Sequence, residues 1–301
     1  MRAIDMQVYC STKKGALVKD PAMLARAQQF FKTETQVTLF KTEEQMADDL
    51  RKAGIKAVIC PPTIPLLPLQ TRDIGEVREL HDYVAQLKRD YPDSILGSWV
   101  GVSPKWGIKG KKELERCIKD LGFFGVAACG ALSGVPLNDK QWYPYYDMCA
   151  QARVPVKLWV GFLGLGAGLP GGGGIRLYTE NPIPHVDDVA AQFPELTIIG
   201  AHVPWPFHHE MTAVLVHKAN VYCETHGWSP KYFPSSFKRD INGRLQDKIM
   251  FGSEYPFFSY ERLFRDWEAE GYKPEILEKV YYKNAQRIFG LSKDKESSGS
   301  E

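Results

Sequence analysis

Eight short apolar runs alternate with amphipathic stretches along this 301-residue chain. Each run is four to ten residues long and rich in Val, Ile, Phe or Tyr, which is the composition of a buried strand. We therefore predict eight strands. They are Ile4–Cys10, Lys56–Pro62, Ile95–Pro104, Phe124–Gly130, Val154–Gly161, Leu196–Pro204, Asn220–Gly227 and Lys248–Pro256.

The stretches between the runs have the spacing of helices, with apolar residues three and four positions apart and charged residues between them. Strands that alternate with helices form a parallel sheet, and eight such units favour a (β/α)8 barrel. A doubly wound sheet is the competing fold, but it usually has fewer strands and a phosphate loop after the first strand. The predicted helices are Thr42–Gly54, Asp73–Asp90, Lys111–Leu121, Lys140–Ala152, Ile183–Phe193 and His208–Ala219.

The chain is predicted to be one domain, because no Pro-, Ser- or Gly-rich linker divides it. We expect a barrel over residues 1–291 with an inserted segment at 11–41, followed by a flexible polar tail at 292–301. A glycine-rich stretch at 164–174 lacks the lysine and ribose-binding acid of a phosphate site, so we expect a mobile loop over the barrel mouth.

Charge and composition exclude several classes of function. The 38 basic and 36 acidic residues leave a net charge of +2, which gives no footprint for nucleic acid or an acidic membrane surface. No apolar run approaches the roughly 20 residues that cross a bilayer. The six cysteines are scattered singly, as in a reduced cytoplasmic protein. We expect a cytoplasmic protein that binds a small molecule.

Polar side chains at the ends of the last three runs are the best candidates for chemistry, because barrel enzymes work at the carboxyl ends of their strands. Alternation along the seventh run turns Glu224 and His226 toward the barrel interior, while the sixth run ends at His202 and the eighth at Glu254. Two histidines and a carboxylate suit one zinc or iron ion. We predict these four residues as metal ligands, with His202 and Glu254 also catalytic. The alternative is that Glu224 and His226 pair with each other in a structural network.

The remaining strand ends carry candidates for a substrate pocket. Lys157 and Trp159 share the inward face of the fifth run. Because a buried charge needs a partner, Lys157 is expected to pair with an acid such as Asp5 or Glu254, or to bind a substrate carboxylate. The predicted pocket residues are Gln7, Tyr9, Lys157 and Trp159.

Four stretches resemble the amidohydrolase superfamily, and within it the branch typified by aminocarboxymuconate-semialdehyde decarboxylase. The stretches are Asn181–Ala190, Ile198–His202, Gly227–Pro234 and Phe251–Pro256. The similarity extends from the first run to about Leu291 and is more specific in the second half. It implies a metal-dependent (β/α)8 barrel that hydrolyses or decarboxylates a small carboxylated molecule with a metal-activated water.

The sequence departs from that family where the metal ligands should lie. The family begins with Asp-x-His-x-His, whereas this chain has Gln7 and Tyr9 at the two histidine positions. The family's strand-five histidine falls at Trp159, and its strand-eight aspartate is replaced by Glu254. His202 is retained, and in the family this position helps to activate water or polarise the substrate.

Two interpretations of these losses remain open. A histidine acting alone as a general base contributes about 10²–10⁴-fold, which is far short of a metal that lowers the pKa of water from about 15.7 to about 7. Either one divalent metal has moved toward strands six to eight, or the chain is a non-catalytic companion subunit. The second interpretation resembles the smaller chain of two-chain amidohydrolase-fold non-haem oxygenases, such as α-aminoisobutyrate hydroxylase. The expected partners are a small-molecule substrate and either a second copy of this chain or a related amidohydrolase chain.

Overall fold

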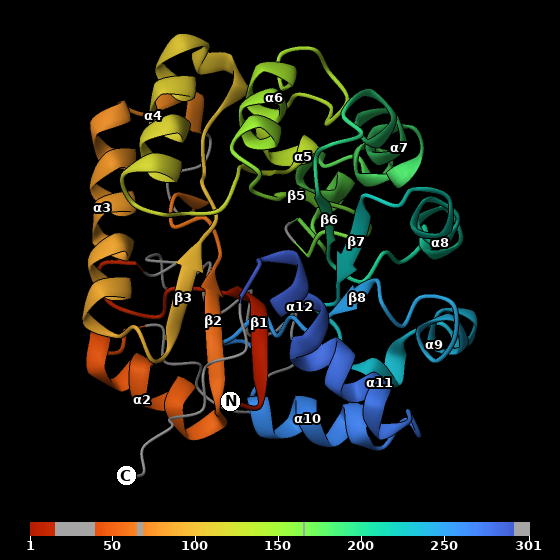
Figure 1. Ribbon diagram of the computed structural model, residues 1–301. Helices are drawn as coiled ribbons and strands as arrows, with labels where there is room; N and C mark the ends of the chain where they lie inside the picture. The colour runs from red at the N-terminus through yellow and green to blue at the C-terminus, as the bar shows by residue number, and fades with distance from the viewer. Residues whose placement is uncertain (16–39, 65–68, 165, 292–301) are drawn as a thin grey trace, which may run out of the picture.

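Eight parallel strands in the computed structural model confirm the predicted (β/α)8 barrel (Figure 1). The structure describes residues 1–15, 40–64, 69–164 and 166–291. The strands are β1 (Ala3–Val8), β2 (Ile55–Ile59), β3 (Ile95–Ser98), β4 (Ala127–Ala128), β5 (Val156–Trp159), β6 (Ile198–Ala201), β7 (Val221–Glu224) and β8 (Ile249–Met250). Each lies within one of the eight predicted runs, apart from one residue at two N-terminal ends.

Strand pairing closes the barrel. Regular hydrogen bonding joins β1, β2 and β3 in one sheet and β4 to β8 in sequence order in another. The parallel bridges Val100–Val126 and Val8–Tyr255 connect the two sheets on both sides. Consecutive strands are therefore neighbours all the way round, which excludes the doubly wound sheet.

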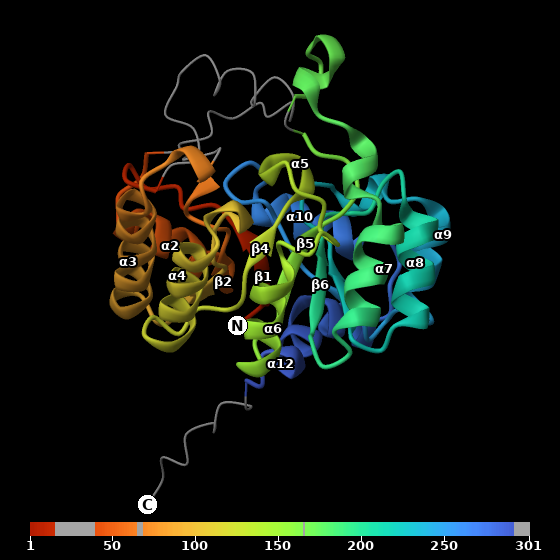
Figure 2. The same ribbon diagram turned by 90° about the horizontal axis from the view of Figure 1, so that it is seen from above.

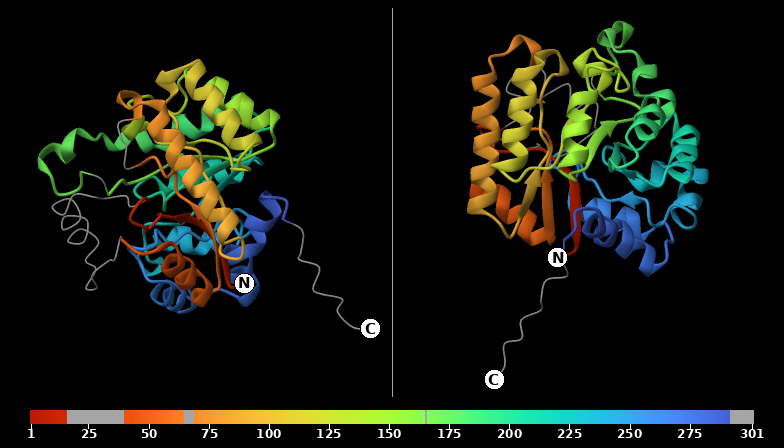
Figure 3. Two further views of the ribbon diagram at one scale, coloured as in Figure 1. Left: turned by 90° about the vertical axis from the view of Figure 1, so that its left-hand side faces the viewer. Right: turned by 45° about the horizontal axis from the view of Figure 1, so that its top comes forward.

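Helices surround the strands on the outside, as the rotated views show (Figures 2 and 3). Six predicted helices are confirmed, whereas α5 and the helices after β7 were not predicted. The helices are α2 (Glu43–Ala53), α3 (Ile74–Asp90), α4 (Ile108–Lys119), α5 (Gly130–Ser133), α6 (Tyr143–Gln151), α7 (Pro182–Gln192), α8 (His208–His217), α9 (Ser235–Ile241), α10 (Tyr260–Glu268), α11 (Pro274–Glu278) and α12 (Asn284–Ile288).

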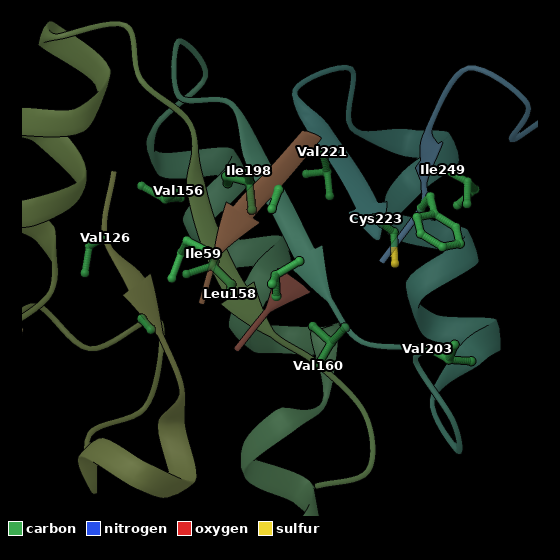
Figure 4. Packing of buried hydrophobic residues seen from close by; sticks show 14 of the residues in the cluster. Ile59, Val126, Val156, Leu158, Val160, Ile198, Val203, Val221, Cys223 and Ile249 are labelled. Atoms are coloured by element: carbon green, nitrogen blue, oxygen red, sulfur yellow. The ribbon is translucent and has the colours of Figure 1, made fainter. Parts of the chain in front are cut away.

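Side chains along β5 alternate between the apolar core, on the helix side of the strand, and the candidate site inside the barrel. Val156, Leu158 and Val160 point the same way, toward the helices, and are fully buried in the main apolar cluster (Figure 4). Complete burial of each such side chain contributes about 1.5–3 kcal/mol. The alternate residues, Lys157 and Trp159, therefore face the barrel interior, as predicted.

The floor of the barrel interior is apolar, and an irregularity in β1 places a polar residue directly above it. Met6 packs with Val58, Ile199 and Met250 in this lower layer. The register of β1 against β2 shifts between Asp5 and Val8, and a local irregularity of this kind redirects side chains. Gln7, although adjacent to Met6, also reaches the interior and contacts residues of the layer above.

The ends of the predicted insertion are joined by a parallel bridge between Thr12 and Lys41. Residues 16–39 of that segment and the predicted tail at 292–301 lie outside the described residues. The glycine-rich stretch contains a short 3-10 helix, Pro170–Gly174, in a segment that projects from the barrel (Figure 2). All six cysteines are buried free thiols. No helix in the described ranges is both long and apolar enough to cross a membrane.

Candidate functional site

His202 and Glu254 both adopt a strained backbone conformation at the carboxyl ends of β6 and β8. Their φ angles are 92° and 68°, and Arg153 is the one other non-glycine residue with positive φ in the described part of the chain. Such a conformation costs of order 1–3 kcal/mol per residue and persists where the surroundings impose it, often at functional sites. A hydrogen bond of 3.0 Å from the Glu254 amide to the Gln7 carbonyl helps to impose it on Glu254.

Gly227 lies between these two side chains. We call the position that its Cβ would occupy, bounded by Gly227, His202 and Glu254, the Gly227 cradle. A Cβ atom at residue 227 would lie 2.6 Å from His202 Nε2 and 3.1 Å from Glu254 Oε2. Glu254 Oε2 is buried and has no hydrogen-bond partner among the described residues. His202 Nδ1 lies 3.4 Å from the Val203 carbonyl oxygen. His202 Nε2 and the unpartnered Glu254 Oε2 therefore both face the Gly227 cradle.

Burial sets the charge state of both residues at the Gly227 cradle. Burial, reinforced by repulsion from His226, lowers the pKa of His202 to about 3. Burial, followed by the negative charge of Glu224, raises the pKa of Glu254 to about 8. At neutral pH His202 is therefore a neutral imidazole, and its Nδ1–H donates to the Val203 carbonyl. This leaves a lone pair at Nε2 beside the carboxyl group of Glu254.

Lys157 occupies the interior below this level and is completely buried. Its Nζ donates to the Met6 carbonyl at 2.9 Å and to Gln7 Oε1 at 2.5 Å. It also forms an ion pair of 2.8 Å with Glu224 Oε1. An ammonium group has three donors, and here each of them has an acceptor.

Glu224 is engaged on both of its oxygens. Oε1 lies 2.6 Å from His226 Nδ1 in addition to its contact with Lys157, and Oε2 accepts from the His226 backbone amide at 2.9 Å. Burial would raise the pKa of Glu224, but charge attraction to His226 and Lys157, together with hydrogen bonds from both side chains, holds it well below its usual range. Glu224 and His226 thus form the internal pair that the structural alternative predicted.

The structure corrects the expected partner of Lys157. Lys157 does pair with an inward acid, as expected, but that acid is Glu224 and neither Asp5 nor Glu254, the two examples given. Asp5 instead accepts hydrogen bonds from Tyr260 and from the amide and hydroxyl of Ser253. The irregularity in β1 explains this difference, because it turns Asp5 away from the interior and Gln7 toward it.

The other predicted pocket residues lie around these groups. Gln7 is buried beside Lys157, and its Nε2 lies 3.0 Å from Cys60 Sγ. The Tyr9 hydroxyl donates to Glu254 Oε1 at 3.4 Å. Trp159 has its ring centre 6.2 Å from that of His226 and also lines a small, mainly apolar cavity of about 50 Å³. Among the four, Trp159 is thus the one that lines this cavity.

Sequence reasoning missed Gly227 as a site residue. The available signal was its position directly after His226 at the end of a strand, where a glycine permits close approach. Its φ of 86° and the contacts that a Cβ would make show that both conformation and space require glycine here.

A second cluster of potential metal ligands lies between α3 and α4. His81, Glu113 and Cys117 are buried, and their donor atoms all lie within 4.8 Å of one another. Glu113 is already engaged by Arg116, at 2.8 and 3.0 Å, and by Arg78 at 3.1 Å. Because these guanidinium groups already bind the Glu113 carboxylate, we interpret the cluster as a structural ion-pair network.

We expect Glu113→Gln to remove part of the acid sensitivity of the fold. Hydrogen bonds from His81 and Arg116 outweigh burial and lower the pKa of Glu113 to about 2. The Glu113 carboxylate therefore contributes about 3 kcal/mol to the free energy of unfolding. This contribution is complete above about pH 4.5 and is lost as the pH falls toward 2. Urea unfolding between pH 2 and 7 measures this. A wild-type advantage over Glu113→Gln that stays constant with pH would contradict the assignment.

Comparison with known proteins establishes the family. The family model described as "Amidohydrolase" matches residues 71–291. The chain belongs to the amidohydrolase family. The resemblance found in the sequence is thereby confirmed. The match begins after β1 and β2, so it leaves out the segment in which Gln7 and Tyr9 stand at the family's histidine positions.

The individual relatives of this amidohydrolase-family chain match it over a short segment or at low sequence identity. It is 38% identical to a 2-keto-4-carboxy-3-hexenedioate hydratase from Sphingobium sp. over 53 residues, which are 16% of each chain. The match therefore spans about a sixth of that curated relative. An uncharacterised TIM-barrel protein from Bordetella bronchiseptica has a TM-score of 0.75 and 21% identity, with 96% of this chain and 99% of that one covered. A dihydroxybenzoic acid decarboxylase from Polaromonas sp. with bound manganese has a TM-score of 0.65 and 17% identity, with 97% of both chains covered. These two structures support the fold.

Proposed function

We propose that this amidohydrolase-family chain is a metal-assisted lyase or hydrolase for a small carboxylated molecule, and that it reacts at the Gly227 cradle. The observation that carries the proposal is the convergence of His202 Nε2 and Glu254 Oε2 on the space over Gly227. Both residues are held in strained conformations there. A buried carboxyl oxygen without a partner is costly unless a ligand, ion or water completes its hydrogen bonding.

The donors at the Gly227 cradle fit one divalent metal ion. An imidazole nitrogen and a carboxylate oxygen converge there, and His226 Nε2 on the neighbouring strand is a third candidate, since the rings of His202 and His226 lie 4.5 Å apart. In the described ranges the donors of these three residues do not all lie within 4.8 Å of one another, so a three-ligand site requires a side-chain rotation. This donor set suits zinc or iron. Glu224 is engaged by Lys157 and would support His226 rather than bind the ion.

The relatives agree with this choice of chemistry. The hydratase and the decarboxylase act on carboxylated compounds according to their names, and the decarboxylase structure contains manganese. A divalent ion in the Gly227 cradle would supply Lewis-acid polarisation of a substrate carboxylate or carbonyl.

The residues of this chain would hold the ion and exclude water. His202 Nδ1–H is taken up by the Val203 carbonyl, so the one lone pair of the ring, at Nε2, would hold the ion and His202 would act as a ligand rather than as a base. Tyr9 restrains Glu254 through its hydroxyl. Trp159 provides an apolar surface above Lys157, with the Lys157 Nζ 5.4 Å from its ring centre. This surface separates the buried ion pair from the substrate.

We expect Gly227→Ala to abolish metal binding by filling the Gly227 cradle. The added methyl group would lie 2.6 Å from His202 Nε2 and 3.1 Å from Glu254 Oε2, so an ion could no longer contact both atoms. Isothermal titration of metal-free protein with Mn²⁺, Zn²⁺ and Fe²⁺ should give about one site per chain for the wild type. The affinity of the variant should be at least about 100-fold lower, at the upper end of the loss seen when the surroundings of a metal site are disturbed.

Gly271→Ala is a matched control for this experiment. Gly271 also has positive φ, at 73°, but an added Cβ would meet nothing within 4 Å. It therefore introduces the same kind of backbone strain without filling a site. Unchanged binding by Gly227→Ala would place the ion elsewhere, and no binding by the wild type would remove the metal from the proposal.

A companion subunit is the second candidate function, and one observation favours it. Gln7, at the position of a family metal ligand, is buried and hydrogen-bonded at both ends of its amide, to Lys157 and Cys60. The β1 side of the barrel is thus closed to a family-type ion. Native mass spectrometry of protein from its source organism tests this function. A stable complex with a related chain that keeps Asp-x-His-x-His would support it, and a homo-oligomer or monomer would argue against it.

A further inference from the structure

Lys157 places a positive charge on the β1 and β5 side of the barrel interior. Its Nζ contacts Gln7 from β1 and Glu224 from β7, and it lies 5.6 Å from the ring centre of Trp99 and 5.4 Å from that of Trp159. Both rings accept the charge through cation–π attraction. The group is fully buried, and the described residues give it three acceptors. The Lys157 ammonium group is therefore enclosed by acceptor atoms and aromatic rings in the way that a bound cation is.

This arrangement also fixes the state of Glu224. A carboxylate that pairs with an ammonium group is ionised and can only accept hydrogen bonds. His226 Nδ1, at 2.6 Å, must therefore carry the hydrogen in that contact. The second ring nitrogen, Nε2, is then left with its lone pair. A carboxylate on one imidazole nitrogen is the usual support for a histidine that binds metal through the other.

We propose that Lys157 is a positioning residue that replaces a metal ion on the β1 and β5 side of the barrel and holds His226, through Glu224, ready to bind an ion at the Gly227 cradle. The inference deepens the proposed function and rests on it for the identity of the ligand, a single divalent cation. The chain then has one metal position, on the side of β6 to β8. The β1 side is excluded because the Gln7 amide oxygen on β1, together with Glu224 from β7, already binds the ammonium group.

The first test locates the ion directly. Crystals of the full chain are soaked with Mn²⁺, and the anomalous signal of manganese is mapped. We expect one peak at the Gly227 cradle, with the Lys157–Glu224 contact intact. A peak bound by Gln7 or Glu224 with Lys157 displaced would overturn the inference.

The second test asks whether Lys157 acts through His226 without requiring metal. NMR of ¹⁵N-histidine protein should show an exchange-protected Nδ1–H proton for His226 in the wild type. Lys157→Gln should lose this protection, because the charge that holds Glu224 is removed. If the single variant does not fold, the manganese map and the wild-type His226 signal still decide the inference. A protected Nδ1–H that survives in Lys157→Gln, or is absent from the wild type, would refute the positioning role.

A matched lysine provides the control. Lys248 Nζ donates to three backbone carbonyls, of Lys218, Ala219 and Val221, but contacts no acid of the site. Lys248→Met should therefore leave the His226 signal and the Mn²⁺ affinity unchanged. The Lys157 variants should bind Mn²⁺ about 10–100-fold more weakly. If the wild type binds no ion, the proposed metal function fails, but the NMR result still decides the role of Lys157.

Discussion

Replacing Lys157 with methionine is expected to lower the free energy of unfolding by about 3–5 kcal/mol, because it leaves the buried Glu224 carboxylate without its cation. Both side chains of the pair are fully buried. The variant also removes the donor that satisfies Gln7 Oε1 and the Met6 carbonyl. Urea unfolding followed by circular dichroism at pH 7 measures the change.

Removing both charges should restore much of this loss. A buried ion pair replaced by apolar residues of similar volume is often neutral in stability, so Lys157→Met/Glu224→Met is expected to be more stable than Lys157→Met alone. Lys248→Met is the control for loss of a lysine that binds backbone carbonyls. A Lys157→Met protein within about 1 kcal/mol of the wild type, the range of an exposed ion pair, would show that the pair is not buried.

Replacing His202 with alanine is expected to lower kcat/KM by at least about 100-fold, because the imidazole nitrogen that would hold the ion beside Glu254 is lost. His202 is the neutral imidazole whose Nε2 faces the Gly227 cradle. The assay screens wild-type protein, with Mn²⁺ or Zn²⁺, against aromatic and aliphatic carboxylates that include dihydroxybenzoic acids. Release of CO₂ reports decarboxylation, and loss of ultraviolet absorbance reports hydration of a conjugated acid.

His208→Ala is the control for this prediction. His208 lies at the start of α8, and its Nδ1 contacts only the Pro206 carbonyl among the hydrogen bonds of the described chain. The kcat/KM of His208→Ala should match that of the wild type. A His202→Ala enzyme that keeps wild-type kcat/KM on the same substrate would show that the reaction does not occur at the Gly227 cradle.

The barrel and the inward direction of its polar residues could be predicted from the sequence, because both follow from periodicity. Alternation in β7 correctly turns Glu224 and His226 inward, and alternation in β5 does the same for Lys157. The pairing of Lys157 could not be predicted, since a shift of register in β1 decides whether Asp5 or Gln7 faces the interior. Such a shift leaves no periodic signal in a strand of six residues.

The role of Gly227 could not be predicted from the sequence either. A glycine after a strand has many explanations, and its importance depends on the approach of His202 and Glu254 from two other strands. The positive φ angles of those two residues also come from tertiary contacts, because His and Glu have little intrinsic preference for them.

The metal content of untagged protein, purified without chelators and measured by elemental analysis, tests the central claim most directly. A single cation held beside His202 and Glu254, with Lys157 supplying the charge on the opposite side, predicts about one transition-metal ion per chain in the wild type. Gly227→Ala should contain none, and Gly271→Ala should match the wild type. A wild-type protein with no metal, or with two ions per chain, would contradict the account.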